Sequence, residues 1–396
     1  MCQGVLPFAL MFLSSFALLF INGRLVTSKM AAPSFASGVS PIVIPTYHPV
    51  IPTEETPPDP TPWNATESVP PFSVIIVTHN EQLLTKTIRS VLANSGEHLL
   101  FEVVIIDDCS KKPVSLPVLD KRIRIIRSNT RLGLIRARIL GGDASRGRFL
   151  AFIDGHVMVA PRWLEEPAAL LSEDPRGLVN FINFALDAKT FSPRDSWQGV
   201  GSSATVSISL EQFWGGGSSK DIFSPITYGM FATSKEWWSL GRMDPGLRVW
   251  GGENVEISFR TWLCGGTIRV AKSSYVAHAF RDRFPYAMNN KILLRNYARV
   301  ATVWMDAHHL SLFYKANGIK LKRGELPFSI GNITQRQALR EKLGCKPFGW
   351  YAARFKNRAL CLPENMRSKQ PYRCGSTHTF SPSDLRSISI PSLFGM

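Results

Sequence analysis

The sequence lacks the motifs of several common classes of basic protein. Lys and Arg number 46 against 30 Asp and Glu, which gives a formal net charge of +16. Even so, there is no zinc-finger spacing, no RNA-recognition signature and no dense run of Lys and Arg. These absences argue against nucleic acid as a partner. The charge would suit an acidic ligand such as a nucleotide diphosphate, although a basic solvated surface accounts for most of it.

A dinucleotide-binding fingerprint is also missing. No Gly-x-Gly-x-x-Gly follows the first expected strand at residues 72–78, so a dinucleotide-binding fold is unsupported. What the chain does have is 396 residues, of which 44% are hydrophobic. This is enough for a sizeable core in one large domain or two ordinary ones.

Positive charge is missing ahead of a long apolar run near the start of the chain. Residues 5–21 are almost wholly apolar, no Lys or Arg precedes them, and Arg24 and Lys29 follow. The positive-inside rule therefore does not support a type II orientation. Because no clean small-x-small cleavage site follows directly, we favour a signal-anchor within residues 1–30 over a cleaved signal peptide.

A tether is expected after this segment. Residues 31–71 are rich in Pro, Ser and Thr, a composition typical of an extended and poorly packing stem. Two Asn-x-Thr glycosylation sequons occur, Asn64-Ala-Thr66 in the stem and Asn332-Ile-Thr334 further along. Both agree with a chain whose main part lies in the secretory lumen.

Strands and helices alternate in the first half of the remaining chain. Apolar runs predict strands at 72–78, 101–106, 122–127 and 148–153, and helical segments are expected up to residue 92 and over 134–144. This alternation predicts an α/β fold with a doubly wound, mostly parallel sheet.

The strand at 148–153 runs directly into Asp154, Gly155 and His156. Ligands of open α/β sheets bind beyond the carboxyl ends of the strands. On an extended segment, Asp154 and His156 would point to the same side, and Gly155 would let a ligand approach closely. One carboxylate and one imidazole form a plausible half-site for a divalent cation. The alternative is a polar strand end whose His is only hydrogen-bonded.

Asp108 follows the strand at 101–106 in the same way. A carboxylate there can hold a ribose or a uracil edge. The alternative is a structural acid that caps a helix or a turn.

Several blocks, taken in order, resemble the polypeptide N-acetylgalactosaminyltransferases, and the resemblance covers about residues 72–352. The blocks are Ser73-Val-Ile-Ile-Val-Thr-His-Asn-Glu81, Val103-Val-Ile-Ile-Asp-Asp108, Arg131-Leu-Gly-Leu-Ile-Arg-Ala-Arg138, Phe152-Ile-Asp-Gly-His156, Trp250-Gly-Gly-Glu-Asn-Val-Glu-Ile-Ser-Phe-Arg260, Cys264-Gly-Gly266, His278-Ala-Phe-Arg281, Val303-Trp-Met-Asp306 and Leu339-Arg-Glu-Lys-Leu-Gly-Cys-Lys-Pro-Phe348. The resemblance implies a retaining GT-A glycosyltransferase, manganese-dependent, that moves N-acetylgalactosamine from UDP-GalNAc to Ser or Thr of proteins. It also implies a single-pass type II Golgi membrane protein with a luminal catalytic domain, here placed at residues 72–356.

The resemblance also implies roles for single residues. The Mn²⁺ ligands would be Asp154, His156 and His278. Trp250 would belong to a mobile loop that covers the donor, with Gly251 and Gly252 as hinges, and would act with Glu253 and Asn254 beside the sugar and acceptor. The positions expected to contact the donor are Val77, Asp108, Arg131, Asp154, Gly155, Tyr228, Gly229, Trp250, Arg281, Phe284 and Tyr286.

Three positions depart from the family pattern. Gly155 stands where the family usually has Ser, and Phe284 replaces a His that helps to bind diphosphate in some members. Tyr228 falls on a glycine that lies against the donor sugar. These departures keep two alternatives open: a catalytically silent donor-binding or scaffold protein, and a transferase for another UDP-sugar.

Cysteines and the C-terminal end complete the comparison. The resemblance implies a disulfide between Cys264 and Cys345, whereas Ser273 stands where a second family disulfide needs Cys. A Cys361–Cys374 pair in the tail is an open alternative. We expect residues 357–396 to be a tail without the ricin-type lectin domain that most members carry.

Overall fold

The structure, a computed structural model, describes residues 71–117, 120–194, 203–214, 222–280, 289–356 and 358–360. The expected signal-anchor, almost all of the stem and the tail beyond residue 360 lie outside these residues. Within the described part, no helix combines the length and apolarity needed to cross a membrane.

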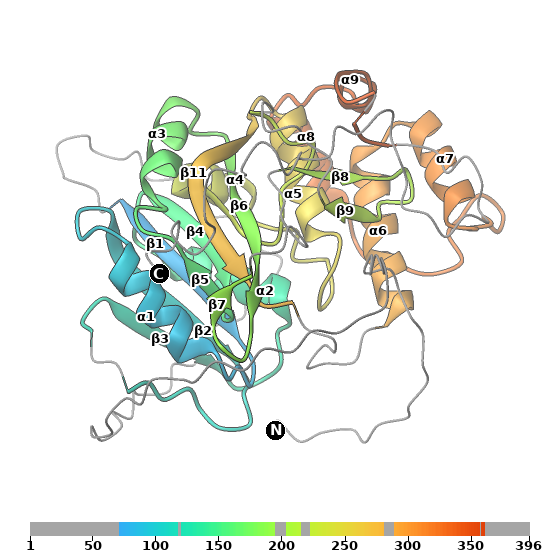
Figure 1. The fold of residues 1–396 in the computed structure, drawn as a ribbon. Helices are drawn as coiled ribbons and strands as arrows, with labels where there is room; N and C mark the ends of the chain where they lie inside the picture. The colour runs from blue at the N-terminus through green and yellow to red at the C-terminus, as the bar shows by residue number, and fades with distance from the viewer. Residues whose placement is uncertain are drawn as a thin grey trace, which may run out of the picture.

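Buried apolar runs form one central sheet of nine strands (Figure 1). Its strand order is β3-β2-β1-β4-β10-β6-β11-β5, and β7 pairs with β6. The strands are β1 (Phe72–Thr78), β2 (Leu100–Asp108), β3 (Ile123–Ser128), β4 (Phe149–Asp154), β5 (Val157–Val159), β6 (Leu178–Asp187), β7 (Ser192–Pro193), β10 (Phe231–Ser234) and β11 (Ile268–His278). A separate hairpin joins β8 (Ala204–Val206) to β9 (Gln212–Trp214).

The sheet is mostly parallel, as the alternation of strands and helices predicted. β3, β2, β1 and β4 run parallel, and so do β6 and β11. The exception inside the sheet is β10, a four-residue strand that lies antiparallel between β4 and β6. β5 is also antiparallel to its neighbour β11.

Helices cover both faces of this sheet, because its central strands are apolar on both sides. On β1, Val74 and Ile76 pack in one core with α1 (Leu84–Asn94) and α3 (Glu165–Glu173). Ile75, between them, packs in the other core with α2 (Leu134–Ala144) and α5 (Glu253–Leu263). The remaining helices are α4 (Lys235–Gly241), α6 (Asn290–Trp304), α7 (Ala307–Ala316), α8 (Thr334–Lys342) and α9 (Phe348–Arg354). The prediction of a doubly wound α/β fold is therefore confirmed.

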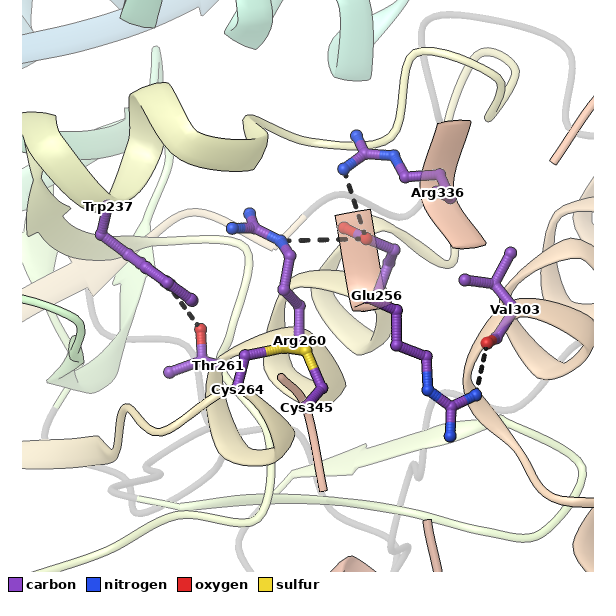
Figure 2. Close-up of a disulfide and its surroundings, with 9 residues drawn as sticks. Trp237, Glu256, Arg260, Thr261, Cys264, Val303, Arg336 and Cys345 are labelled. Carbon is purple, nitrogen blue, oxygen red and sulfur yellow. Dashed lines mark hydrogen bonds and ion pairs between the residues drawn. A yellow bond between two sulfur atoms is a disulfide. The ribbon is translucent and has the colours of Figure 1, made fainter. Parts of the chain in front are cut away.

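A disulfide joins the end of α5 to the turn after α8. Cys264 and Cys345 are bonded, with their Cα atoms 4.1 Å apart and their positions separated by 81 in sequence (Figure 2). The pairing implied by the resemblance is therefore confirmed. Closing a loop of this length stabilises a fold by about 4 kcal/mol on the chain-entropy view.

A buried network of charges lies close to this disulfide. Glu256 of α5 faces Arg260 and Arg336 at 3.9 and 3.8 Å (Figure 2). Asp244 is better paired, because Arg299 donates to both of its carboxylate oxygens at 2.7 and 3.0 Å. Such networks fix the relative positions of the elements that carry them, here α5, α6 and α8.

Candidate metal and donor site

Two strand ends and a turn bring Asp154, His156 and His278 together. Asp154 is the last residue of β4, and His156 lies in the turn before β5. His278 ends β11 opposite Val157 of β5, and the backbone N–H of Ala279 donates to the carbonyl of His156 at 3.1 Å. One potential ligand atom from each of the three residues lies within 4.8 Å of the other two.

One part of the sequence prediction is wrong. Residues 154–156 do not form a continuous extended segment, because β4 ends at Asp154 and the chain turns at Gly155 and His156. Gly155 has a packing role in this turn, and its expected role in letting a ligand approach stays a prediction. A Cβ there would lie 3.0 Å from Cγ of Glu81, so the missing side chain lets Glu81 pack against the turn.

The charges around the three side chains suit a divalent cation. Burial would raise the pKa of Asp154, but His278, 3.3 Å away, and Arg138 hold that pKa well below its usual range. Burial lowers the pKa of both His156 and His278. Both rings are then neutral near pH 7, which is the form that binds metals. One carboxylate and two imidazoles form a donor set typical of borderline divalent metals.

Glu81 lies beside a candidate metal ligand, a position that the sequence reasoning did not predict. Its Oε2 lies 2.9 Å from Nδ1 of His156, and its Oε1 accepts the backbone N–H of Leu83 at 3.0 Å. With Nδ1 engaged in this way, a metal would have to be bound by Nε2 of His156. A carboxylate behind a ligand His fixes the orientation of the ring and raises its basicity.

We predict that Glu81→Gln weakens the apparent affinity for Mn²⁺ by about tenfold, because a neutral amide orients the ring less firmly. Metal titration followed by isothermal calorimetry measures the change. Glu165→Gln is the control, since that carboxylate pairs with Arg162 on the surface. Equal affinities in Glu81→Gln and wild type would contradict the prediction.

Arg138 is a second residue that was missed. It is almost fully buried in α2, and its Nη2 donates to Oδ1 of Asp154 at 3.1 Å. Its Nη1 is buried and has no hydrogen-bond partner within the described residues. Gly229 lies beside it, since a Cβ on Gly229 would be 3.9 Å from Nη2.

The start of α5 places two more polar side chains in this region. Glu253 is 1% exposed, its Oε2 is buried without a described hydrogen-bond partner, and burial raises its pKa despite the nearby positive charge of Arg138. Asn254 donates to Oε1 of Gln212 at 3.3 Å, whereas its Oδ1 has no described partner. Buried polar atoms in native proteins are nearly always satisfied. Within the described part of the chain, these atoms of Arg138, Glu253 and Asn254 are available to a polar ligand.

The expected nucleotide contacts meet at the ends of β1 and β2. Val77 pairs with Asp154 on β4, so it lies next to the metal site. Asp108 accepts the backbone N–H groups of Leu132 and Gly133 at 2.6 and 3.1 Å and also pairs with the guanidinium of Arg131. The carboxylate thus holds the turn before α2. This is the structural role that the sequence left open, and contact with a nucleotide stays a prediction.

The expected donor loop packs against α6, where the side chain of Asn296 donates to its main-chain carbonyls. Trp250 is half-buried there, and Gly251 and Gly252 have φ of 94° and 86°, which only glycine adopts readily. The implied role of Trp250 in covering the donor stays a prediction.

Tyr228 is buried, with 2% of its surface exposed, and belongs to the larger hydrophobic core. Thr227 just before it is fixed by bonds to Asn180 and Ser258. Tyr228 is thus packed from the core side, next to Gly229, and its effect on donor choice stays a prediction. The expected diphosphate contacts Arg281, Phe284 and Tyr286 lie outside the described residues.

Comparisons with known proteins agree with this architecture. Residues 73–232 match the family model described as glycosyl transferase family 2. The chain is 36% identical over 302 residues to human polypeptide N-acetylgalactosaminyltransferase 14, covering 72% of this chain and 53% of the relative. It is 35% identical over 308 residues to polypeptide N-acetylgalactosaminyltransferase 3 of Drosophila melanogaster, covering 72% and 46%. The chain spans about half the length of the curated relatives it matches.

A solved structure shares the fold. The crystal structure of GalNAc-T7 with UDP, GalNAc and Mn²⁺ superimposes with a TM-score of 0.62 at 28% identity, over 73% of this chain and 57% of that chain. Together with the sequence matches, this similarity shows that the chain has the GT-A glycosyltransferase fold and is similar to the polypeptide N-acetylgalactosaminyltransferases over about half of their length.

Proposed function

We propose that this protein is a retaining, Mn²⁺-dependent glycosyltransferase that moves N-acetylgalactosamine from UDP-GalNAc to Ser or Thr of proteins. The observation that carries the proposal is the Asp154, His156 and His278 cluster, next to buried polar atoms of Arg138 and Glu253 that have no hydrogen-bond partner within the described residues. It lies in a fold shared with a relative that was crystallised with UDP, GalNAc and Mn²⁺.

The side chains divide the work by their positions. Asp154, His156 and His278 would hold the cation, which, when bound, neutralises charge on the departing diphosphate. Arg138 would donate hydrogen bonds to the sugar, and the carboxylate of Glu253 would accept them. Trp250 and Asn254 would line the opposite side of the sugar and the position of the acceptor. Because Glu253 and Arg138 are held in place before the donor arrives, they need little reorganisation on binding.

The test is a transfer assay. The luminal part of the chain is incubated with a panel of UDP-sugars, Mn²⁺ and a Ser/Thr peptide library. Transfer from UDP-GalNAc supports the proposal. Transfer only from another UDP-sugar supports the alternative of a transferase with a different donor. Binding of UDP–Mn²⁺ without any transfer supports a catalytically silent donor-binding protein.

Tyr228 gives this assay a sharper form. If its ring narrows the sugar pocket, Tyr228→Gly should raise kcat/KM for UDP-GalNAc relative to UDP-galactose by about tenfold or more, because overpacking a pocket costs about 1–3 kcal/mol. Removing a buried ring also leaves a cavity, so folding is checked by circular dichroism. An unchanged ratio in a folded variant shows that Tyr228 serves only the core.

We also propose that the chain is a type II Golgi membrane protein, anchored by its first 30 residues, with a luminal catalytic domain. The Cys264–Cys345 disulfide supports an oxidising compartment. The sequon at Asn332 provides a test. Asn332 is exposed, its Oδ1 accepts the N–H of Thr334 at 2.8 Å, and its amide nitrogen has no described partner.

We predict an N-linked glycan on Asn332 in protein expressed by animal cells. Removal by peptide N-glycosidase should shift its mobility on a gel, and Asn332→Gln should lose one glycan. Thr334→Ser is the matched control that keeps the sequon, and Thr334→Ala destroys it. Identical glycan content in wild type and Asn332→Gln would contradict a luminal location for this loop.

A further inference from the structure

The loop that carries Trp250 has a backbone conformation that it cannot keep alone. Val249, Gly251 and Gly252 all have positive φ, at 58°, 94° and 86°. For a β-branched residue such as Val249 this region is strained. A strained backbone persists only where the surrounding structure over-determines it. Residues 248–252 are therefore held in place by their neighbours.

Asn296 of α6 holds the loop from one side. Its side chain is fully buried, and its described hydrogen bonds go to main-chain atoms of the loop and to Nη1 of Arg295, which donates to Oδ1 at 3.3 Å. Nδ2 lies within donating distance of the carbonyls of Arg248 at 2.8 Å, Gly251 at 3.0 Å and Trp250 at 3.3 Å. Oδ1 accepts the backbone N–H of Arg248 at 3.0 Å. Only a carboxamide offers both donors and an acceptor at this length.

The loop packs closely against the surface of α6. A Cβ on Gly251 would lie 2.3 Å from Cδ1 of Leu293, and one on Gly252 would lie 3.4 Å from Cβ of Asn296. Gly251 therefore serves close approach to α6 as well as its φ angle, whereas Gly252 is favoured by its φ angle and is in ordinary contact with α6.

Gly133 supports the loop from the other side. A Cβ on Gly133 would lie 2.7 Å from Cα of Val249. The N–H of Gly133 is bonded to Asp108. The loop is thus held between α6 and the turn that Asp108 organises.

We propose that Asn296 is a positioning residue, which sets Trp250 and Glu253 by clamping the main chain of residues 248–251. This inference rests on the proposed function, because it assigns the clamp a role in donor transfer. Asn296 makes no contact with the three candidate metal ligands among its described bonds. Its effect should therefore appear in turnover more than in nucleotide affinity.

The experiment compares wild type with Asn296→Ala and Asn296→Asp. The Asp variant keeps the shape and the acceptor oxygen but loses the Nδ2 donors. Asn94→Ala is the control, since Asn94 also donates from a helix to a main-chain carbonyl, that of Val159 at 2.8 Å. Melting temperatures confirm that each variant is folded.

Two readouts are taken. Hydrogen exchange is followed for peptides that cover residues 247–253, and kcat, KM and the UDP–Mn²⁺ dissociation constant are measured. We expect faster exchange in both Asn296 variants and a fall in kcat of about tenfold to a hundredfold, since a misplacement of about 1 Å can cost that much. The UDP–Mn²⁺ dissociation constant should change by less than about threefold.

The outcomes separate this inference from the proposed function. Exchange and kcat like those of Asn94→Ala in both Asn296 variants would overturn the clamp. A fall in kcat confined to Asn296→Ala would also overturn it. The shape of the side chain, and not the hydrogen bonds donated by Nδ2, would then hold the loop. If wild type transfers no sugar, the proposed function fails, and the exchange of residues 247–253 alone decides whether Asn296 holds the loop. Gly133→Ala, which presses on Val249 from the opposite side, should raise exchange in the same peptides.

Discussion

Asp154→Asn is expected to abolish Mn²⁺-dependent sugar transfer while leaving the protein folded. The amide still accepts a hydrogen bond from Arg138, so the buried guanidinium keeps a partner. It no longer offers a charged oxygen to a metal held with His156 and His278. The more drastic Asp154→Ala should also lose turnover, and its folding should suffer more because it leaves Arg138 unpaired.

Binding of Mn²⁺ gives a readout that does not need turnover. In wild type, a metal concentration one hundred times the dissociation constant stabilises the folded state by about 2.7 kcal/mol, which raises the melting temperature by several degrees. Asp154→Asn, His156→Ala and His278→Ala should each lose this shift. Asp187→Ala is the matched control, as Asp187 also ends a strand but its side chain bonds, among the described residues, to its own turn and to Arg194. Normal turnover with Mn²⁺ in Asp154→Asn would refute the metal assignment.

Asp244→Ala is expected to cost about 3–5 kcal/mol in the free energy of unfolding. It would leave the buried guanidinium of Arg299 without the carboxylate that receives two of its hydrogen bonds. Glu256→Gln should cost far less, about 1 kcal/mol or below. The carboxylate oxygens of Glu256 are 3.8 Å or more from the nearest arginine nitrogens, and burial raises its pKa. Urea denaturation measures the free energy of unfolding of both variants. Equal losses in Asp244→Ala and Glu256→Gln would contradict the prediction.

The pairing of Asp244 with its arginines also predicts that stability depends on pH. Burial would raise the pKa of Asp244, but Arg336 and Arg299 outweigh it and hold that pKa below its usual value. A lowered pKa in the folded state adds stability above the unfolded pKa of about 3.9 and loses it as the pH falls through the folded value. Wild type should therefore lose free energy of unfolding as the pH falls below about 4. This loss should be smaller in Asp244→Asn. A parallel pH profile in the two proteins would be inconsistent with this pairing.

The sequence predicted the local part of the fold well. The helix expected at 134–144 matches α2, and the strand at 72–78 matches β1, because apolar runs with clear ends determine such elements. β10 was not predicted. Phe231–Ser234 is only four residues long, and its place between β4 and β6 depends on pairing with strands far away in the sequence.

The candidate site was predicted to a similar extent. Asp154 and His156 were visible as polar residues at a strand end, whereas His278 came only from the family resemblance, since it reaches them through β11. The buried position of Arg138 could have been predicted from its spacing in the helix. It lies three residues after Ile135 and one before Ile139, on the helix face that is buried. Glu81 had only a weak signal, its position just beyond the end of β1.

The late position of β10 in the chain also bears on how the protein is made. Until residues 231–234 leave the ribosome, β4 and β6 expose facing edges with unpaired backbone groups in the centre of the future sheet. Exposed edges of this kind template aggregation. Nascent chains that end between β6 and β10 should therefore depend on chaperones. Fragments cut before residue 231 should be insoluble, even though they contain two of the three candidate metal ligands.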